Sequence, residues 1–89
     1  MNMRLNPKYI MREVAGETLL ISLEDISAPK RLLCLNELGR DIYSLLRAGK
    51  DEEQIVADLL TEYEVEESCL RADVCEFLQR LLQFGVLME

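Results

Sequence analysis

The hydrophobic pattern of the chain changes its period at Asn36, and this change limits the folds available to it. Short β-rich runs precede Asn36, whereas Leu38, Ile42, Leu45 and Leu46 follow it at the spacing of a helix that faces a core. Asparagine is a favoured N-cap because its side-chain oxygen accepts an otherwise unpaired amide hydrogen in the first helical turn. The sequence therefore predicts strands before Asn36 and helices after it.

Three strands are predicted before Asn36. Residues 9–14 and 18–23 are expected to form a hairpin across Ala15-Gly16-Glu17, because glycine supplies the backbone angles of a tight connection. Residues 31–35 are nearly all apolar and too short for an independent helix, so they are predicted to form a third, short strand.

Three helices are predicted after Asn36. The first spans residues 37–48, and the second begins at the capping-box pair Asp51 and Gln54 and ends near Tyr63. The third runs from about residue 67 to residue 84, and the tail after it folds back. This order predicts an α+β unit, with residues 1–89 as a single domain.

Gly39 falls inside the first turn of the first predicted helix. Glycine there costs about 0.5 to 1 kcal/mol relative to alanine, so its presence indicates a close backbone approach. Simple tolerance of the glycine is the alternative.

The net charge of −7 argues against two classes of partner. Its field repels phosphate backbones and anionic membranes, so neither nucleic acid nor a membrane is expected as a partner. No apolar run approaches the roughly 18 to 20 residues that span a bilayer, and residues 1–10 lack the apolar core of a signal peptide. The expected compartment is the cytoplasm.

The composition offers little for catalysis. The chain has no histidine, which removes the commonest general base and metal ligand. Cys34, Cys69 and Cys75 form no CxxC motif and are expected to be reduced thiols, buried as small apolar side chains. We therefore expect no catalytic residues, no metal site and no cofactor.

The third predicted helix carries more apolar surface than one core contact needs. At about 100° per residue, Leu70, Val74, Phe77 and Leu81 form one stripe, which is expected to face the core. A second stripe follows it around the helix, formed by Arg71, Cys75, Leu78 and Leu82. Two explanations stay open: this second stripe packs on the sheet or the tail, or it forms one wall of a binding groove. In the second case the edge of the strand at residues 31–35 forms the other wall.

Several segments in this order resemble the PqqD-like family, named for a pyrroloquinoline quinone biosynthesis protein, whose fold is the RiPP recognition element. They are the early "VAGETLLI", "LLCLNELGRDIYSLL", "GKDEEQIVADLLTEYEV" and the ending "ADVCEFLQRLLQFGVL". The resemblance covers about residues 5–88. It implies a winged-helix-like domain, with a three-stranded antiparallel sheet followed by three helices.

The resemblance also implies a function. The domain would bind the leader of a ribosomally synthesised precursor peptide by strand addition and present the precursor to a modifying enzyme, often a radical SAM enzyme. The residues that the resemblance assigns to the peptide are Arg31, Leu32, Leu33, Cys34 and Leu35 on the strand and Arg71, Cys75, Leu78 and Leu82 on the helix. Because leaders are often acidic, the basic patch around Lys30, Arg31 and Arg71 is expected to offset the net charge.

Other functions remain as alternatives. The domain could be a protein–protein adaptor in another biosynthetic pathway, whose partner is a folded surface. A winged-helix nucleic-acid binder is disfavoured because the third helix offers only Arg71 and Arg80, roughly 180° apart. An exposed strand edge is compatible with a monomer or a weak homodimer.

Overall fold

A computed structural model describes residues 3–23 and 32–88 of the chain. The elements follow in the order β1 (Arg4–Leu5), β2 (Tyr9–Val14), β3 (Glu17–Ser22), β4 (Leu32–Leu35), α1 (Glu37–Arg47), α2 (Glu52–Leu60), α3 (Glu67–Phe84) and β5 (Leu87–Met88). The predicted class, a three-stranded antiparallel sheet followed by three helices, is confirmed. Arg31, the predicted first residue of the third strand, lies outside the described residues.

The main sheet has the strand order β2-β3-β4, so β4 lies at an edge. Val14 pairs with Glu17, which leaves Ala15 and Gly16 as a two-residue turn. Both have positive φ, 53° and 81°, as a type I′ hairpin turn requires. The predicted connection included Glu17; instead, Glu17 is the first residue of β3 because this tight turn needs only two residues.

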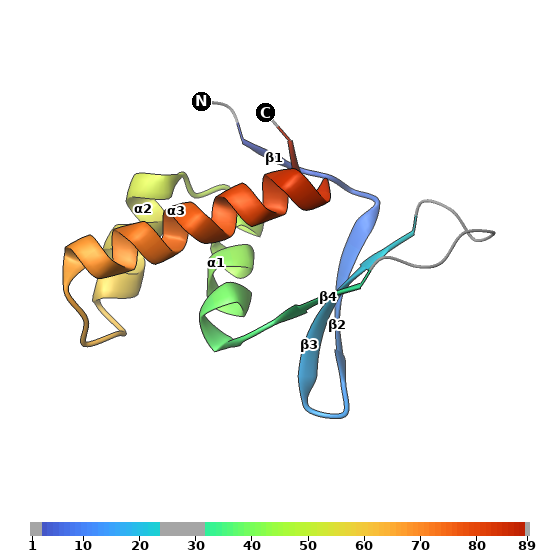
Figure 1. The fold of residues 1–89 in the computed structure, drawn as a ribbon, viewed down its shortest axis with the longest axis horizontal. Helices are drawn as coiled ribbons and strands as arrows, with labels where there is room; N and C mark the ends of the chain where they lie inside the picture. Colours follow the sequence, from blue (N-terminus) through green and yellow to red (C-terminus); the bar gives the residue numbers. More distant parts are fainter. Residues whose placement is uncertain (1–2, 24–31, 89) are drawn as a thin grey trace.

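The two faces of the sheet differ in burial. Side chains alternate between the faces of a strand, and Leu20 and Leu35 on one face are buried in the core. On the opposite face Val14 and Leu32 are more than half exposed. In Figure 1 the helices gather on one side of the molecule, and the β2–β3 hairpin projects away from them.

Local capping chemistry fixes the starts of α1 and α2. The Gly39 amide donates to Asn36 Oδ1 over 2.7 Å, which confirms the predicted N-cap. The Asp51–Gln54 capping box is also present. The prediction that the second helix ends near Tyr63 was wrong: α2 ends at Leu60, because Thr61 caps it and its hydroxyl donates to the Asp58 carbonyl.

The helix α3 supplies much of the core. Leu70, Val74, Leu78 and Leu81 are all buried, and they pack with buried residues of α1, α2 and the sheet in one cluster. Gly85 ends the helix with φ of 84°.

The beginning and end of the described chain contact each other beside α3, and these contacts are called the β1–β5 clasp. Leu5 of β1 pairs with Leu87 of β5, and Asn6 Nδ2 donates to the Gly85 carbonyl over 3.0 Å. The hydroxyl of Tyr9 donates to the Phe84 carbonyl, also over 3.0 Å. The tail after α3 folds back as predicted, whereas β1 was not predicted. Figure 1 shows β1 beside the C-terminal end of α3.

Candidate peptide-binding site

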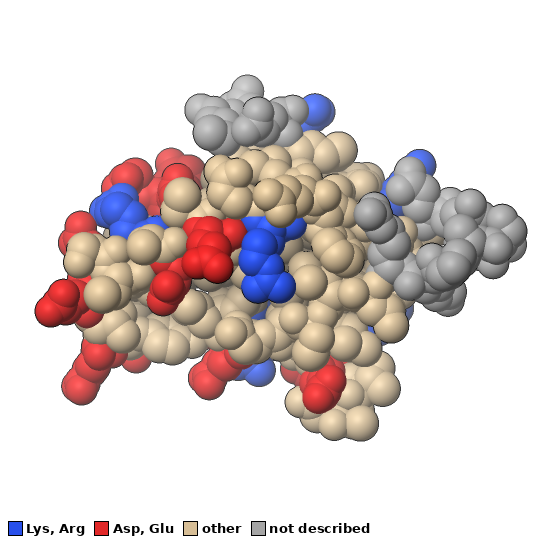
Figure 2. All heavy atoms as spheres, in the orientation of Figure 1, with Lys and Arg blue, Asp and Glu red and all other residues tan. Residues whose placement is uncertain are grey.

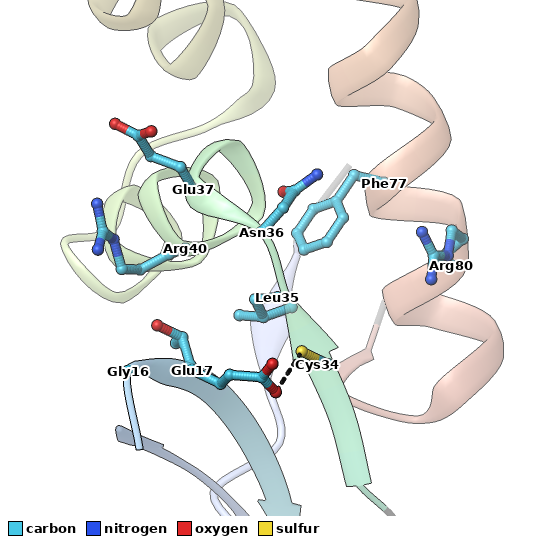
Figure 3. Close-up of a pocket in the computed structure, with 10 residues that line it drawn as sticks. Gly16, Glu17, Cys34, Leu35, Asn36, Glu37, Arg40, Phe77 and Arg80 are labelled. Atoms are coloured by element: carbon cyan, nitrogen blue, oxygen red, sulfur yellow. Dashed lines mark hydrogen bonds between the residues drawn. The ribbon is translucent and has the colours of Figure 1, made fainter. Parts of the chain in front are cut away.

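A hollow with a volume of about 760 Å³ lies where β4, the start of α1 and α3 meet. Ligand sites in proteins commonly measure about 300 to 1,000 Å³. The turn and start of β3, the end of β4 and one side of α3 line the hollow, through residues that include Gly16, Glu17, Cys34, Asn36, Phe77 and Arg80. Figure 3 shows that these side chains come from segments far apart in the sequence.

One wall of this site is a strand edge. In an antiparallel pair, alternate residues direct their N–H and C=O groups away from the partner strand. Over the described residues no strand pairs with the outer side of β4. The edge of β4 is therefore able to pair with an added strand.

The position of Phe77 depends on Gly39. A Cβ atom on Gly39 would lie 3.0 Å from Phe77 Cε1 and 3.2 Å from Asn36 Oδ1. Glycine thus lets the ring lie against the first turn of α1, which confirms the close approach that this glycine indicated. A smaller hollow of about 260 Å³ shares Asn36, Phe77 and Arg80 with the first. The ring of Phe77 is half-buried, so part of it is open to a ligand.

The charged groups at the hollow differ in how far they are engaged. Arg40 Nε lies 3.7 Å from Asp41 Oδ1, and that carboxylate also accepts a 2.7 Å hydrogen bond from the Tyr63 hydroxyl. Arg80 is exposed and makes no hydrogen bond or ion pair with another residue of the described chain. In Figure 3, Arg80 lies on the α3 side of β4, and Arg40, Glu17 and Glu37 lie on the other side.

The thiol of Cys34 is not activated by its surroundings. Its Sγ lies 3.6 Å from Glu17 Oε2, to which it donates. Desolvation, followed by the charge of Glu17 and this hydrogen bond, raises the pKa of the Cys34 thiol. Because the thiolate is the nucleophilic form, this environment keeps the sulfur unreactive.

The predicted strand residues differ in accessibility. Leu32 and Cys34 are exposed, Leu33 is half-buried, and Leu35 is buried. Cys34 and Leu35 line the hollow. Arg31 lies outside the described residues.

The predicted α3 residues lie on another side of the helix. Arg71 donates to Glu53 Oε1 over 2.7 Å and to Glu67 Oε2 over 3.1 Å, and these bonds raise its pKa. Leu78 is 4% exposed and belongs to the core, and Leu82 packs against that core. Cys75 is exposed, as are Cys34 and Cys69, so the expected burial of the cysteines was wrong.

At 100° per residue, the predicted α3 residues lie roughly 100° to 160° around the helix from Phe77. The hollow does not include them, and that they contact a ligand stays a prediction. Phe77 and Arg80 were not predicted as lining residues, although Gly39 signalled that something approaches α1 closely.

The acidic charge of the chain gathers away from the hollow. Residues 51–67 contain eight carboxylates and no Lys or Arg. They are Asp51, Glu52, Glu53, Asp58, Glu62, Glu64, Glu66 and Glu67. Figure 2 shows acidic atoms concentrated over the end of the molecule that holds α2 and the start of α3. The lining of the larger hollow is itself balanced, with Glu17 and Glu37 against Arg40 and Arg80.

Two kinds of feature are absent from the part of the chain that the structure describes. There, no cluster of three or more His, Cys, Asp or Glu side chains is arranged to hold a metal ion. Likewise, none of the described helices combines the length and apolar character needed to cross a bilayer.

The model of the family described as coenzyme PQQ synthesis protein D (PqqD) matches residues 17–87. The chain belongs to the PqqD family. PqqD-family domains are noncatalytic peptide-binding modules, which agrees with the expectation that this one is not an enzyme. No curated protein matches the chain.

Two solved structures resemble this PqqD-family domain. One is TbiB1 in complex with the TbiA(beta) leader peptide, with 26% identity and a TM-score of 0.80 over 94% of this chain and 93% of that chain. The other is lasso peptide synthetase B1 complexed with the leader peptide, with 22% identity and a TM-score of 0.82 over 98% of both chains. At that lower identity the second likeness shows the fold alone.

Proposed function

We propose that this PqqD-family domain binds the leader of a ribosomally synthesised precursor peptide by adding it as a strand to β4, and presents the precursor to a modifying enzyme. The observation that carries the proposal is the unpaired edge of β4 beside the hollow lined by Phe77 and Arg80. The similarity to TbiB1, solved with a leader peptide, supports it.

In strand addition, backbone and side chains contribute differently to binding. Backbone hydrogen bonds along β4 supply affinity for an extended peptide of any sequence, and pockets for alternate side chains supply specificity and register. The half-buried ring of Phe77 offers an apolar surface for one leader side chain. An affinity in the micromolar range, about −8 kcal/mol, suits capture followed by release.

The domain raises the local concentration of the precursor at its enzyme and performs no chemistry itself. The enzyme is of the radical SAM class in our proposal, as the family resemblance implies. Both proteins would work in the cytoplasm, where precursor peptides are synthesised.

An amide chemical-shift titration with the leader of the precursor encoded beside this gene tests the proposal. We expect the largest shifts at residues 32–36 and 77–80 and small shifts over α2. The same spectra decide between the two sides of α3, because shifts at residues 71, 75, 78 and 82 would instead support the set that the family resemblance implies.

Two results would contradict strand addition. The first is a folded, monomeric sample that shows no shifts with the leader, which would favour an adaptor that binds a folded protein. The second is binding with shifts confined to residues far from β4. Val65→Ala serves as a matched control for Phe77→Ala, because Val65 is an exposed apolar residue that lines neither hollow and belongs to neither predicted set. We expect Phe77→Ala to weaken leader binding and Val65→Ala to leave it unchanged.

A further inference from the structure

We propose that Arg80 selects leaders that carry a carboxylate side chain next to the residue that contacts Phe77. This inference rests on the proposed leader binding and names the class of leader that the site accepts. Phe77 and Arg80 lie three residues apart on α3, so both side chains point to the same side of the helix, and both line the two hollows.

The first support is that Arg80 has no partner in the described chain. Guanidinium groups on protein surfaces recognise carboxylates through two parallel hydrogen bonds, and this recognition needs unoccupied donors. Arg71, the other arginine of α3, directs its donors to Glu53 and Glu67. Arg40, across β4 from Arg80, already has Asp41 at 3.7 Å.

The second support is that the neighbouring carboxylates leave Arg80 unpaired. Asp73 and Glu76 on α3 line the smaller hollow together with Arg80, and they would repel an acidic leader unless its carboxylate meets the guanidinium directly. Glu76 precedes Arg80 by one helical turn, the favourable order for an ion pair, yet the two groups form no salt bridge. A leader carboxylate would therefore meet an unneutralised guanidinium beside an apolar ring.

Binding of a fluorescein-labelled synthetic leader, from the precursor encoded beside this gene, tests the inference by anisotropy. Arg80→Gln removes the charge and the donors, and Arg80→Lys keeps the charge without the planar donor pair. Arg12→Gln is the matched control, since it removes one exposed positive charge from β2, which does not adjoin β4. Circular dichroism verifies that each variant is folded.

We expect Arg80→Gln to weaken binding by about 5- to 30-fold, the range for one charge-assisted contact, and Arg80→Lys to fall in between. The dissociation constant of Arg12→Gln for the leader should stay within about twofold of the wild-type value, as expected for a distant screened charge. Each carboxylate of the leader is then replaced singly by an amide. At one position we expect this replacement to weaken binding strongly to the wild-type protein and not at all to Arg80→Gln, because that carboxylate and Arg80 act as a pair.

Three results would overturn the inference. Equal losses for Arg80→Gln and Arg12→Gln would show a long-range charge effect. If the loss of affinity from each leader carboxylate were additive with the loss from Arg80→Gln, none of these carboxylates would contact Arg80. Tight binding of a leader without carboxylates would lead to the same conclusion. In each of these cases the leader still binds, so the proposed function stands. A wild-type protein that binds no leader would overturn both.

Discussion

Replacing Gly39 by alanine tests how α1 and α3 are fitted together at the hollow. The new Cβ would lie 3.0 Å from Phe77 Cε1 and 3.2 Å from Asn36 Oδ1, the oxygen that caps α1. These separations are tighter than ordinary van der Waals contact, so the ring or the cap has to move.

Two opposing free energies decide the outcome. Alanine gains about 0.5 to 1 kcal/mol over glycine within a helix, whereas overpacking a filled contact costs about 1 to 3 kcal/mol. The cap oxygen is held by the 2.7 Å bond from the Gly39 amide, so the ring of Phe77 takes up most of the displacement. We expect Gly39→Ala to lower the free energy of unfolding by about 1 kcal/mol.

Urea unfolding followed by circular dichroism measures this cost. For a small domain a loss of this size lowers the midpoint by about 0.3 to 1 M. Because Phe77 lines the hollow, leader binding should weaken as well. The control is Gly39→Ala in a Phe77→Leu background, where the smaller side chain leaves room and the cost should shrink. A midpoint for Gly39→Ala equal to or above that of wild type would refute this account of the contact.

Two further variants test single hydrogen bonds. Asn36→Ala removes the N-cap of α1 and should lower the free energy of unfolding by about 1 kcal/mol in urea titrations, whereas Asn36→Asp, an equally good cap, should retain most of it. The Tyr63 hydroxyl donates to Asp41, and this bond raises the pKa of Tyr63 to about 12. Because the folded-state pKa is the higher one, the stability from this bond should be complete below pH 10, the ordinary tyrosine pKa, and should be lost as the pH rises through about 12. Tyr63→Phe should flatten that decline, and an ultraviolet titration that finds an ordinary tyrosinate pKa would contradict the assignment.

Local chemistry explains which parts of the fold could be predicted from sequence. The cap at Asn36 and the capping box at Asp51 and Gln54 depend on residues three positions apart. A short stretch of sequence is therefore enough to predict each of them. The two-residue strand β1 has no periodic signal of its own, because its pairing partner Leu87 lies at the other end of the chain. The end of α2 was missed because the apolar spacing continues to Tyr63, which packs against the core and whose amide still donates to the Leu59 carbonyl after the helix has ended.

The α3 side of the site required tertiary information. Helical periodicity identifies two neighbouring apolar stripes on α3 but not which neighbour each one meets. The pairing of Arg71 with Glu53 shows that the predicted stripe approaches α2. The closeness of Phe77 to Gly39 places the other side of the helix against the start of α1, at the hollow that the end of β4 also lines. Gly39 indicated a close approach, but its sequence context could not identify the partner.

The clasp between β1 and β5 has a consequence for the order of folding. Its contacts join residues 75 or more positions apart, as in the bonds from Tyr9 to Phe84 and from Asn6 to Gly85, whereas the β2–β3 hairpin and the helix caps are local. Closing so long a loop costs entropy that only the rest of the folded domain can offset, so the clasp should form last during folding. The same pairing should open first in the native state, with its amide protons exchanging ahead of those in the centre of α3. Each opening would loosen the C-terminal end of α3 while the hollow near its middle stays assembled.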